Sequence, residues 1–233
     1  MPHAIKILMI LTSQATMGDN PRPTGVWFEE LSTPYYAFTD AGAHVDIASV
    51  KGGVIPVDPH SIQAGEGNPP SVNRFQQDKT AMGKLMQSMS INGVVVDGYD
   101  AIFLPGGHGT MWDLPQSAEL AALLSKAWGQ GKVLGAVCHG PAGLVQVKDE
   151  TGQPLVAGRH LAGFTNTEED AAGLSHVVPF LLESRLRGLG AIYQRGPDFQ
   201  PYAVRDGRLV TGQNPASSEL AARLTLEAIS STH

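Results

Sequence analysis

The chain has 233 residues, 42% of them hydrophobic, which is enough for one large α/β domain or two small ones whose core needs no covalent cross-links. Its single cysteine excludes an intramolecular disulfide, and its net charge of −6, with 16 Lys and Arg and no basic cluster, argues against nucleic acid or an anionic membrane as partner. The N-terminal apolar run, about seven residues long, is too short for a signal peptide or a membrane span. We therefore expect a cytoplasmic protein.

Short aliphatic runs alternate with amphipathic stretches along the chain. The runs at 5–11, 44–50, 100–107 and 132–138 each lead into Gly, Pro or a polar turn and predict buried strands. Residues 117–131 predict a helix that ends at Gly131, with an apolar face made by Leu120, Leu123, Leu124 and Ala127. Continuous apolar strands between amphipathic helices indicate a mostly parallel sheet covered on both faces. We expect one domain over 1–233, a doubly wound three-layer α/β/α sandwich.

One region fits this alternation poorly. Residues 51–98 are punctuated by Gly and Pro and contain one plausible helix, near 79–89. Insertions of this length are usually lids, binding loops or oligomer contacts. We expect a lid-like segment here.

The only cysteine, Cys138, lies in "GKVLGAVCHGPAGLV" (131–145), where a predicted strand ends among small residues. This pattern permits the tight strand-to-helix turn of a nucleophile elbow. The unpaired amides of a helix N-terminus favour a thiolate, so we expect the pKa of Cys138 to be lowered. The alternative, a small apolar side chain that closes a core strand, is less favoured beside the glycines and the next residue, His139.

Three further groups are candidates to act with the thiol. His139 is suited to proton transfer beside it. The glycine pair Gly106–Gly107, also expected at the carboxyl edge of the sheet, allows an amide there to pair with the amide of His139 in an oxyanion hole. Adjacent helical residues point about 100° apart, so one carboxylate of Glu29 and Glu30 can turn inward, where burial near the thiol would raise its pKa.

Four segments, in order from the first strand to the last helix, resemble the ThiJ/PfpI superfamily. They are "TGVWFEELSTPYYAFTDAGAHVDIAS", "IFLPGGHGTMWDLP", "GAVCHGPAGL" and "LVTGQNPASS". Within it the chain is most similar to the glutathione-independent glyoxalases, also described as heat-shock chaperones and protein deglycases. The resemblance implies a flavodoxin-like sandwich, a homodimer, Cys138 as nucleophile, Glu30 as its protonated partner and His139 as the adjacent imidazole.

The resemblance also implies a carboxylate after a Gly-Phe strand that orients the histidine. "LAGFTNTEEDAAGL" (161–174) offers Glu168, Glu169 and Asp170. Spacing from Phe164 favours Glu169, with Glu168 as the alternative. We expect His108 and Trp112, in the "PGGHGTMW" segment, to help bind the substrate.

The chemistry implied is attack of the thiolate on the aldehyde carbon of methylglyoxal. A proton then moves between the two carbons through an enediol, with Glu30 or His139 as the base, and hydrolysis of a thioester releases lactate. The amides of Gly107 and His139 would hold the oxyanion. This route needs no metal or organic cofactor, and the sequence has no Cys or His spacing typical of zinc, no G-x-G-x-x-G and no P-loop.

Other classes share parts of this pattern. A class I glutamine amidotransferase would carry a His-x-Glu pair after the cysteine, and none of the later histidines is followed by Glu at that spacing: His160, His176 and His233. A PfpI-type peptidase would use the same Cys and His. A holdase chaperone, or an oxidation sensor with an exposed thiol beside Glu30, stays open, but a sensor has no need of His139 or Glu169.

Overall fold

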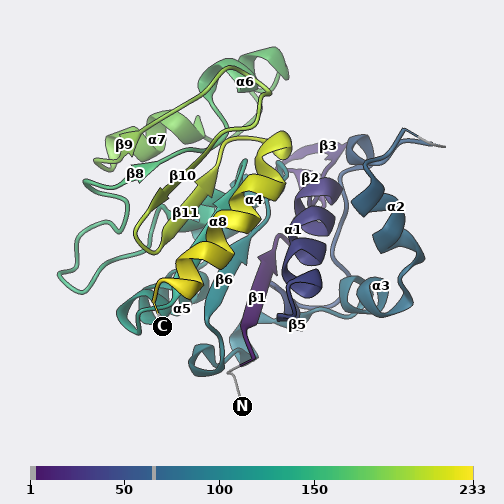
Figure 1. Cartoon of the computed structure of the whole chain (residues 1–233). Coiled ribbons are helices and arrows are strands. Elements are labelled where there is room, and N and C mark those ends of the chain that lie inside the picture. Colours follow the sequence, from purple (N-terminus) through teal and green to yellow (C-terminus); the bar gives the residue numbers. More distant parts are fainter. Residues whose placement is uncertain (1–3, 65–66, 233) are drawn as a thin grey trace.

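The structure, a computed structural model, describes residues 4–64 and 67–232, which fold around a central seven-stranded sheet (Figure 1). The strand order is β10-β11-β7-β6-β1-β4-β5, and every neighbouring pair is parallel except the antiparallel pair β10 and β11. The strands are β1 (Lys6–Leu11), β4 (His44–Ser49), β5 (Met89–Ser90), β6 (Ala101–Leu104), β7 (Val133–Val137), β10 (Ala203–Asp206) and β11 (Leu209–Gly212).

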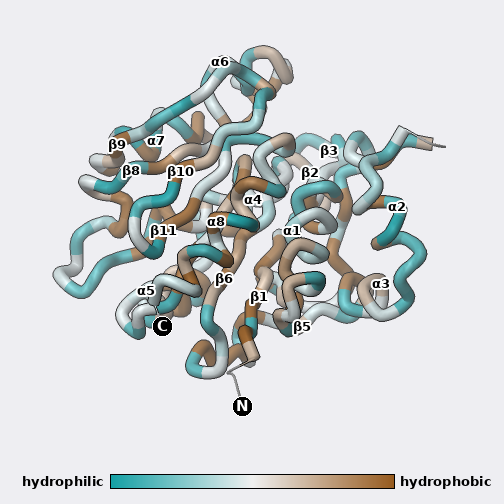
Figure 2. Tube along the Cα trace, viewed as in Figure 1, coloured by the Kyte–Doolittle hydropathy of each residue, from teal (hydrophilic) through white to brown (hydrophobic). Residues whose placement is uncertain are grey.

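Helices cover both faces of this sheet. Successive residues of a strand point to opposite sides, so a strand that is apolar throughout needs a helix layer on each face. On β6, the ring of Phe103 meets Phe38 of α1 (Phe28–Asp40), which packs beside α8 (Ser218–Ser230). The next residue, Leu104, points to the opposite layer, which holds Leu120 of α5 (Ala118–Gly129). In Figure 2 the hydrophobic segments gather along β1 and β6, between these layers. The predicted three-layer α/β/α sandwich is confirmed.

The four predicted strands and the predicted helix are present, each within a few residues of its expected bounds. Ile7, Leu8, Met9, Ile10 and Leu11 of β1 are fully buried, as the continuous apolar run requires. The helix begins at Ala118, where the Ser117 hydroxyl accepts a hydrogen bond from the amide of Leu120.

The segment 51–98 differs from its prediction. Its described residues contain two α-helices rather than one, α2 (Pro70–Gln77) and α3 (Lys79–Met86), and three short 3-10 helices. The ring of Phe75 packs edge-on against Phe28 and Tyr35, at centroid distances of 5.4 and 5.2 Å, and so fastens α2 to the outer face of α1. Strand β5 joins the edge of the sheet. The segment is thus a covering layer for α1 and β4.

The remaining elements are short and lie at the carboxyl edge of the sheet or beside β10 (Figure 1). Residues 166–193 carry two helices and a strand that pairs with the strand at 160–161, on the β10 side (Figure 1). The bounds are β2 (Thr16–Met17), β3 (Asn20–Pro23), α4 (Thr110–Asp113), the 3-10 helix η5 (Gly140–Leu144), β8 (His160–Leu161), α6 (Asn166–Ala171), α7 (Leu182–Gly188) and β9 (Ile192–Tyr193).

Candidate active site

Cys138 lies at the sharp turn between β7 and η5. Its φ of 61° falls in the left-handed region, which a residue with a Cβ adopts only under strain. The amide of Cys138 donates to the carbonyl of Gly212 at 2.9 Å, so the neighbouring strand β11 holds the turn. The side chain is 3% exposed. This is the geometry of a nucleophile elbow, with the sulfur at the carboxyl edge of the sheet.

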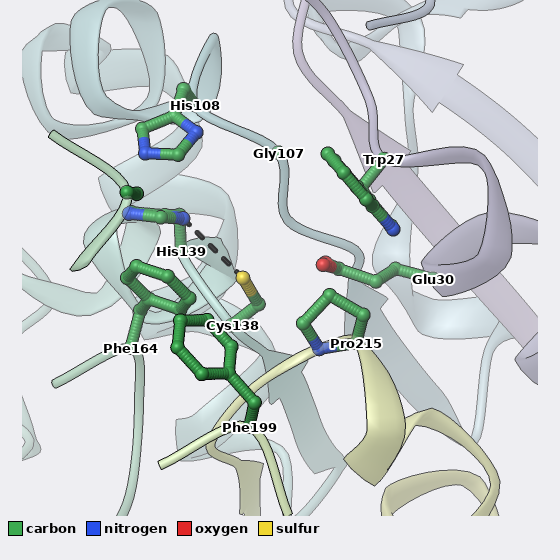
Figure 3. Close-up of a pocket in the computed structure, with 10 residues that line it drawn as sticks. Trp27, Glu30, Gly107, His108, Cys138, His139, Phe164, Phe199 and Pro215 are labelled. Carbon is green, nitrogen blue, oxygen red and sulfur yellow. Dashed lines mark hydrogen bonds between the residues drawn. The ribbon is translucent and has the colours of Figure 1, made fainter. Parts of the chain in front are cut away.

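His139 connects the sulfur to a carboxylate. Its Nδ1 lies 3.3 Å from Sγ of Cys138 (Figure 3), and its Nε2 lies 2.7 Å from Oε2 of Glu169. An ionised carboxylate only accepts hydrogen bonds, so Nε2 carries the proton and Nδ1 of the neutral ring is free to accept the thiol proton. Burial, followed by the nearby imidazole of His108, lowers the pKa of His139, which keeps the ring neutral.

Glu169, not Glu168, is the carboxylate that reaches His139. Both residues lie on α6, and Oε1 of Glu169 also binds Nε2 of His108 at 2.7 Å. Burial by itself would raise the pKa of Glu169, but the two imidazoles together hold that pKa well below its usual range. The residue is therefore ionised and can stabilise an imidazolium at His139.

Glu30 faces the sulfur from the other side. It is fully buried on α1, where Glu29 beside it stays partly exposed. Oε2 of Glu30 accepts a hydrogen bond from the amide of Gly106 at 2.6 Å, and the carboxyl points toward Cys138 across the pocket in Figure 3. Burial raises the pKa of Glu30 to about 8, only partly offset by the nearby thiol of Cys138 and by the hydrogen bond from the amide of Gly106. The carboxyl is thus protonated at neutral pH, as the sequence predicted.

The expected lowering of the pKa of Cys138 is wrong. Burial raises the pKa of the thiol well above its usual value, and the amide of His139 lowers it only in part. The element after the turn is a 3-10 helix of only five residues. Activation of Cys138 therefore depends on a base, and the nitrogen in position is Nδ1 of His139.

Gly106 and Gly107 bring the backbone of the turn after β6 against the site. A Cβ on Gly106 would lie 2.6 Å from Oε2 of Glu30 and 2.7 Å from the amide nitrogen of His139. Gly107 has a φ of 101°, and a Cβ there would lie 2.2 Å from the carbonyl oxygen of Gly25. Only glycine fits at either position.

A cavity of about 180 Å³ opens onto the sulfur (Figure 3). Apart from the polar groups already described, its walls are apolar. The lining residues are Trp27, Glu30, Gly107, His108, Cys138, His139, Phe164, Ala172, Phe199 and Pro215.

Two expectations about this pocket are not met. Trp112 is not among the lining residues and packs instead against Gly18 in the turn between β2 and β3. None of the lining residues comes from the described parts of the segment, 51–64 and 67–98, so these residues do not form the expected lid over the pocket. Phe199 and Pro215 are walls that the sequence analysis missed, and for Phe199 no local motif could have revealed it.

His108, His139 and Glu169 also form a set that could hold a metal ion. Their ligand atoms lie within 4.8 Å of one another, and all three residues are buried or nearly so. Two imidazoles and one carboxylate are donors that Zn²⁺ accepts. The sequence showed no zinc spacing because these residues come from three separate parts of the chain.

Comparisons with known proteins place the chain in a family. Residues 24–228 match the model of the DJ-1/PfpI family, and the chain belongs to that family. It is 32% identical to the glutathione-independent glyoxalase HSP31 of Saccharomyces cerevisiae, over 96% of this chain and 98% of that protein. It is 31% identical to glyoxalase 3 of Candida albicans, over 92% and 94%.

Solved structures of similar proteins have the same fold as this chain. The structure of rapid encystment protein REP24 from Francisella tularensis matches with a TM-score of 0.92 and 38% identity, over 97% of this chain and 99% of that one. Glyoxalase III from Candida albicans matches with a TM-score of 0.87 and 29% identity, over 96% and 97%. The flavodoxin-like fold and the similarity to the glyoxalase branch, both expected from sequence motifs, are confirmed. In the described part of the chain, no helix has the length and apolar character needed to cross a membrane.

Proposed function

We propose that the protein is a glutathione-independent glyoxalase that converts methylglyoxal, or a related 2-oxoaldehyde, to a 2-hydroxy acid. The observation that carries this proposal is the arrangement around one sulfur: Nδ1 of His139 on one side, a protonated Glu30 on the other, and a small apolar cavity in front. An aldehyde carbon is an electrophile of suitable size for such a pocket. The named activity of the relatives supports the same reaction class.

The first step forms a carbon–sulfur bond. Nδ1 of His139 takes the thiol proton as the sulfur of Cys138 attacks the aldehyde carbon, and the ionised Glu169 stabilises the imidazolium. The aldehyde oxygen becomes an oxyanion, which the amides of Gly107 and His139 hold. Glu30 then donates its proton to that oxygen, which gives a neutral hemithioacetal and leaves Glu30 as a carboxylate.

The second step moves a hydrogen between two carbons. The Glu30 carboxylate takes the proton from the former aldehyde carbon while the imidazolium of His139 protonates the neighbouring ketone oxygen, which produces an enediol. Glu30 returns its proton to the second carbon, and the hydroxyl on the first carbon gives its proton to His139. The product is a thioester of the 2-hydroxy acid, with no net oxidation or reduction.

The last step is hydrolysis of the thioester. A water molecule attacks the thioester carbon, and its oxygen with one hydrogen becomes the hydroxyl of the acid. The other proton of the water goes to the Glu30 carboxylate, and protonated His139 gives its proton to the departing sulfur of Cys138, which restores all three groups. No step in this sequence draws on a metal or an organic cofactor. We also propose that the protein is a homodimer, as the family resemblance implies, and that it works in the cytoplasm, since a chain with a single cysteine suits a reducing compartment. Light scattering after size-exclusion chromatography tests the dimer.

The alternatives make different demands on the thiol. An oxidation sensor needs an exposed, acidic thiol, whereas Cys138 is buried and has a raised pKa, so the geometry argues against that role. A PfpI-type peptidase would need a site that admits a peptide, whereas the cavity at Cys138 is small, about 180 Å³. A holdase chaperone would not need Cys138 at all, so its suppression of client aggregation should survive Cys138→Ser.

The test is incubation with methylglyoxal in the absence of glutathione, with lactate measured by a stereospecific assay. We expect lactate from the wild-type protein and none from Cys138→Ser, with unchanged circular dichroism. Absence of lactate from the wild type at any enzyme concentration would refute the proposed function. Lactate from Cys138→Ser would remove Cys138 as the nucleophile.

A further inference from the structure

Glu168 is fully buried on α6 next to Glu169, but its carboxyl binds other groups than His139. Its Oε1 accepts hydrogen bonds from three donors: the amide of Phe199 at 2.7 Å, Nδ2 of Asn214 at 2.8 Å and Nε2 of Gln213 at 3.1 Å. Its Oε2 accepts from the amide and hydroxyl of Thr165, each at 3.0 Å. A buried carboxylate with this many donors is a rigid anchor.

The most unusual group bound by this anchor is Phe199. Its φ of 56° places a residue with a large side chain in the left-handed region, which needs surrounding contacts to hold it. The hydrogen bond to Glu168 is one such contact. The loop before Phe199 is held as well, because Thr167 of α6 donates to Asp198 at 2.8 Å and Gln213 accepts from the amide of Gly196 at 2.9 Å.

The conformation of Phe199 sends its ring into the wall of the pocket. The ring stands beside Cys138 and Phe164 in Figure 3, and its centroid lies 6.2 Å from that of Phe164. Phe199 is nevertheless 48% exposed, so its outer side faces solvent. The ring therefore separates the sulfur from the surrounding water. Because its outer side faces solvent, its position depends on the backbone hydrogen bond to Glu168 more than on packing.

We propose that Phe199 limits the size of the substituent on the 2-oxoaldehyde substrate, and that Glu168 is the positioning residue that sets this limit by holding Phe199 in place. This inference rests on the proposed function. It assigns the two neighbouring carboxylates of α6 different tasks: Glu169 orients His139, and Glu168 shapes the pocket.

The test compares a small and a bulky substrate, methylglyoxal and phenylglyoxal, by kcat/KM for wild type and Phe199→Ala. Removal of the ring enlarges the pocket and exposes it to water, so we expect the ratio of phenylglyoxal to methylglyoxal kcat/KM to rise about tenfold. Phe199→Gly should give the same rise, because glycine accepts the positive φ without strain. The adjacent exposed residue provides the control, and Gln200→Ala should leave the ratio unchanged.

Glu168→Gln keeps the size of the side chain but puts an amide donor where only acceptors fit. We expect KM to rise several-fold, kcat to stay within about twofold, and the substrate ratio to shift in the same direction as in Phe199→Ala but less. The double variant Glu168→Gln/Phe199→Ala should show the ratio of Phe199→Ala alone, since both changes act on one wall. If Glu168→Gln does not fold, Glu168→Asp, which keeps the charge but withdraws it by one methylene, is measured instead.

An unchanged ratio in Phe199→Ala would overturn the proposal, and additive shifts in the double variant would overturn the role of Glu168. Both outcomes are distinct from failure of the proposed function, in which the wild type consumes neither substrate.

Discussion

The two nitrogens of His139 have different tasks, and the difference comes from Glu169. The carboxylate binds Nε2 at 2.7 Å and thereby leaves Nδ1, 3.3 Å from the sulfur, without a proton. The thiol of Cys138 has a raised pKa and does not ionise unaided at neutral pH. In the proposed mechanism, the tautomer of His139 therefore controls whether Cys138 can react.

Glu169→Gln tests this tautomer argument. A glutamine can donate its amide proton to Nε2, which would move the ring proton to Nδ1 and remove the base that faces the sulfur. We expect kcat to fall about 10³- to 10⁴-fold, as for comparable triads. The matched control is Glu168→Gln, one position away, whose kcat should stay within about twofold.

Steady-state kinetics with methylglyoxal measure both variants, and alkylation of Cys138 by iodoacetamide reports the reactivity of the thiol independently. Equal losses of kcat in the two variants would contradict the assignment of Glu169.

At the scale of elements, the turn after β6 joins α1 to the elbow after β7. Gly106 donates to Glu30 on α1 and lies against the amide of His139, so three separate segments meet at one residue without a side chain. Close approach of this kind demands glycine wherever backbone contacts backbone. The positions of Glu30 and Cys138 relative to each other therefore depend on the turn.

Gly106→Ala should disturb both stability and activity. The new Cβ would meet the Glu30 carboxyl and the His139 amide at under 3 Å, and relief of such overpacking costs about 1–3 kcal/mol. We expect urea denaturation to show that loss and methylglyoxal turnover to fall at least tenfold. Gly83→Ala is the control, because Gly83 lies inside α3 with open space around its Cβ position, and alanine there should stabilise by about 0.5–1 kcal/mol. A fully active Gly106→Ala protein would contradict the close packing.

Elements with strong apolar patterns were predictable, and weakly patterned ones were not. Strand β1 is a continuous apolar run, but α2 buries only Val72 and Phe75 among eight residues, and β10 buries only Val204. Such elements form because α1 and β11 offer them a surface, which local sequence does not encode.

At the scale of the whole molecule, a protonated carboxyl is buried between α1 and the sheet, and this links stability to pH. The pKa of Glu30 rises from 4.5 to about 8 on folding, so the folded state binds the proton more tightly than the unfolded state. The stability that this provides is complete below about pH 4.5 and is lost as the pH rises through about 8. The shift corresponds to about 5 kcal/mol as an order of magnitude.

Glu30→Gln imitates the protonated acid and should remove this dependence. We expect the unfolding free energy of the wild type to fall between pH 5 and pH 9 more steeply than that of Glu30→Gln, measured by urea denaturation. The variant should remain soluble but lose methylglyoxal activity by at least about a hundredfold, since it has no proton to give or take. Parallel stability curves for the two proteins would show that Glu30 is not protonated in the folded state.

The sequence by itself determined the fold class, the strand that ends at Cys138 and the candidate residue His139, because apolar periodicity and small residues at a turn are local signals. It left Glu29 and Glu30 open as the inward carboxylate, and only the family resemblance pointed to Glu30. Tertiary structure alone decided which of Glu168 and Glu169 reaches His139, how burial raises rather than lowers the pKa of Cys138, and that Phe199 rather than Trp112 or the 51–98 segment walls the pocket. These outcomes depend on groups far apart in the chain. Such groups come into contact, and the site is shielded from water, only after the sheet and its surrounding loops have assembled.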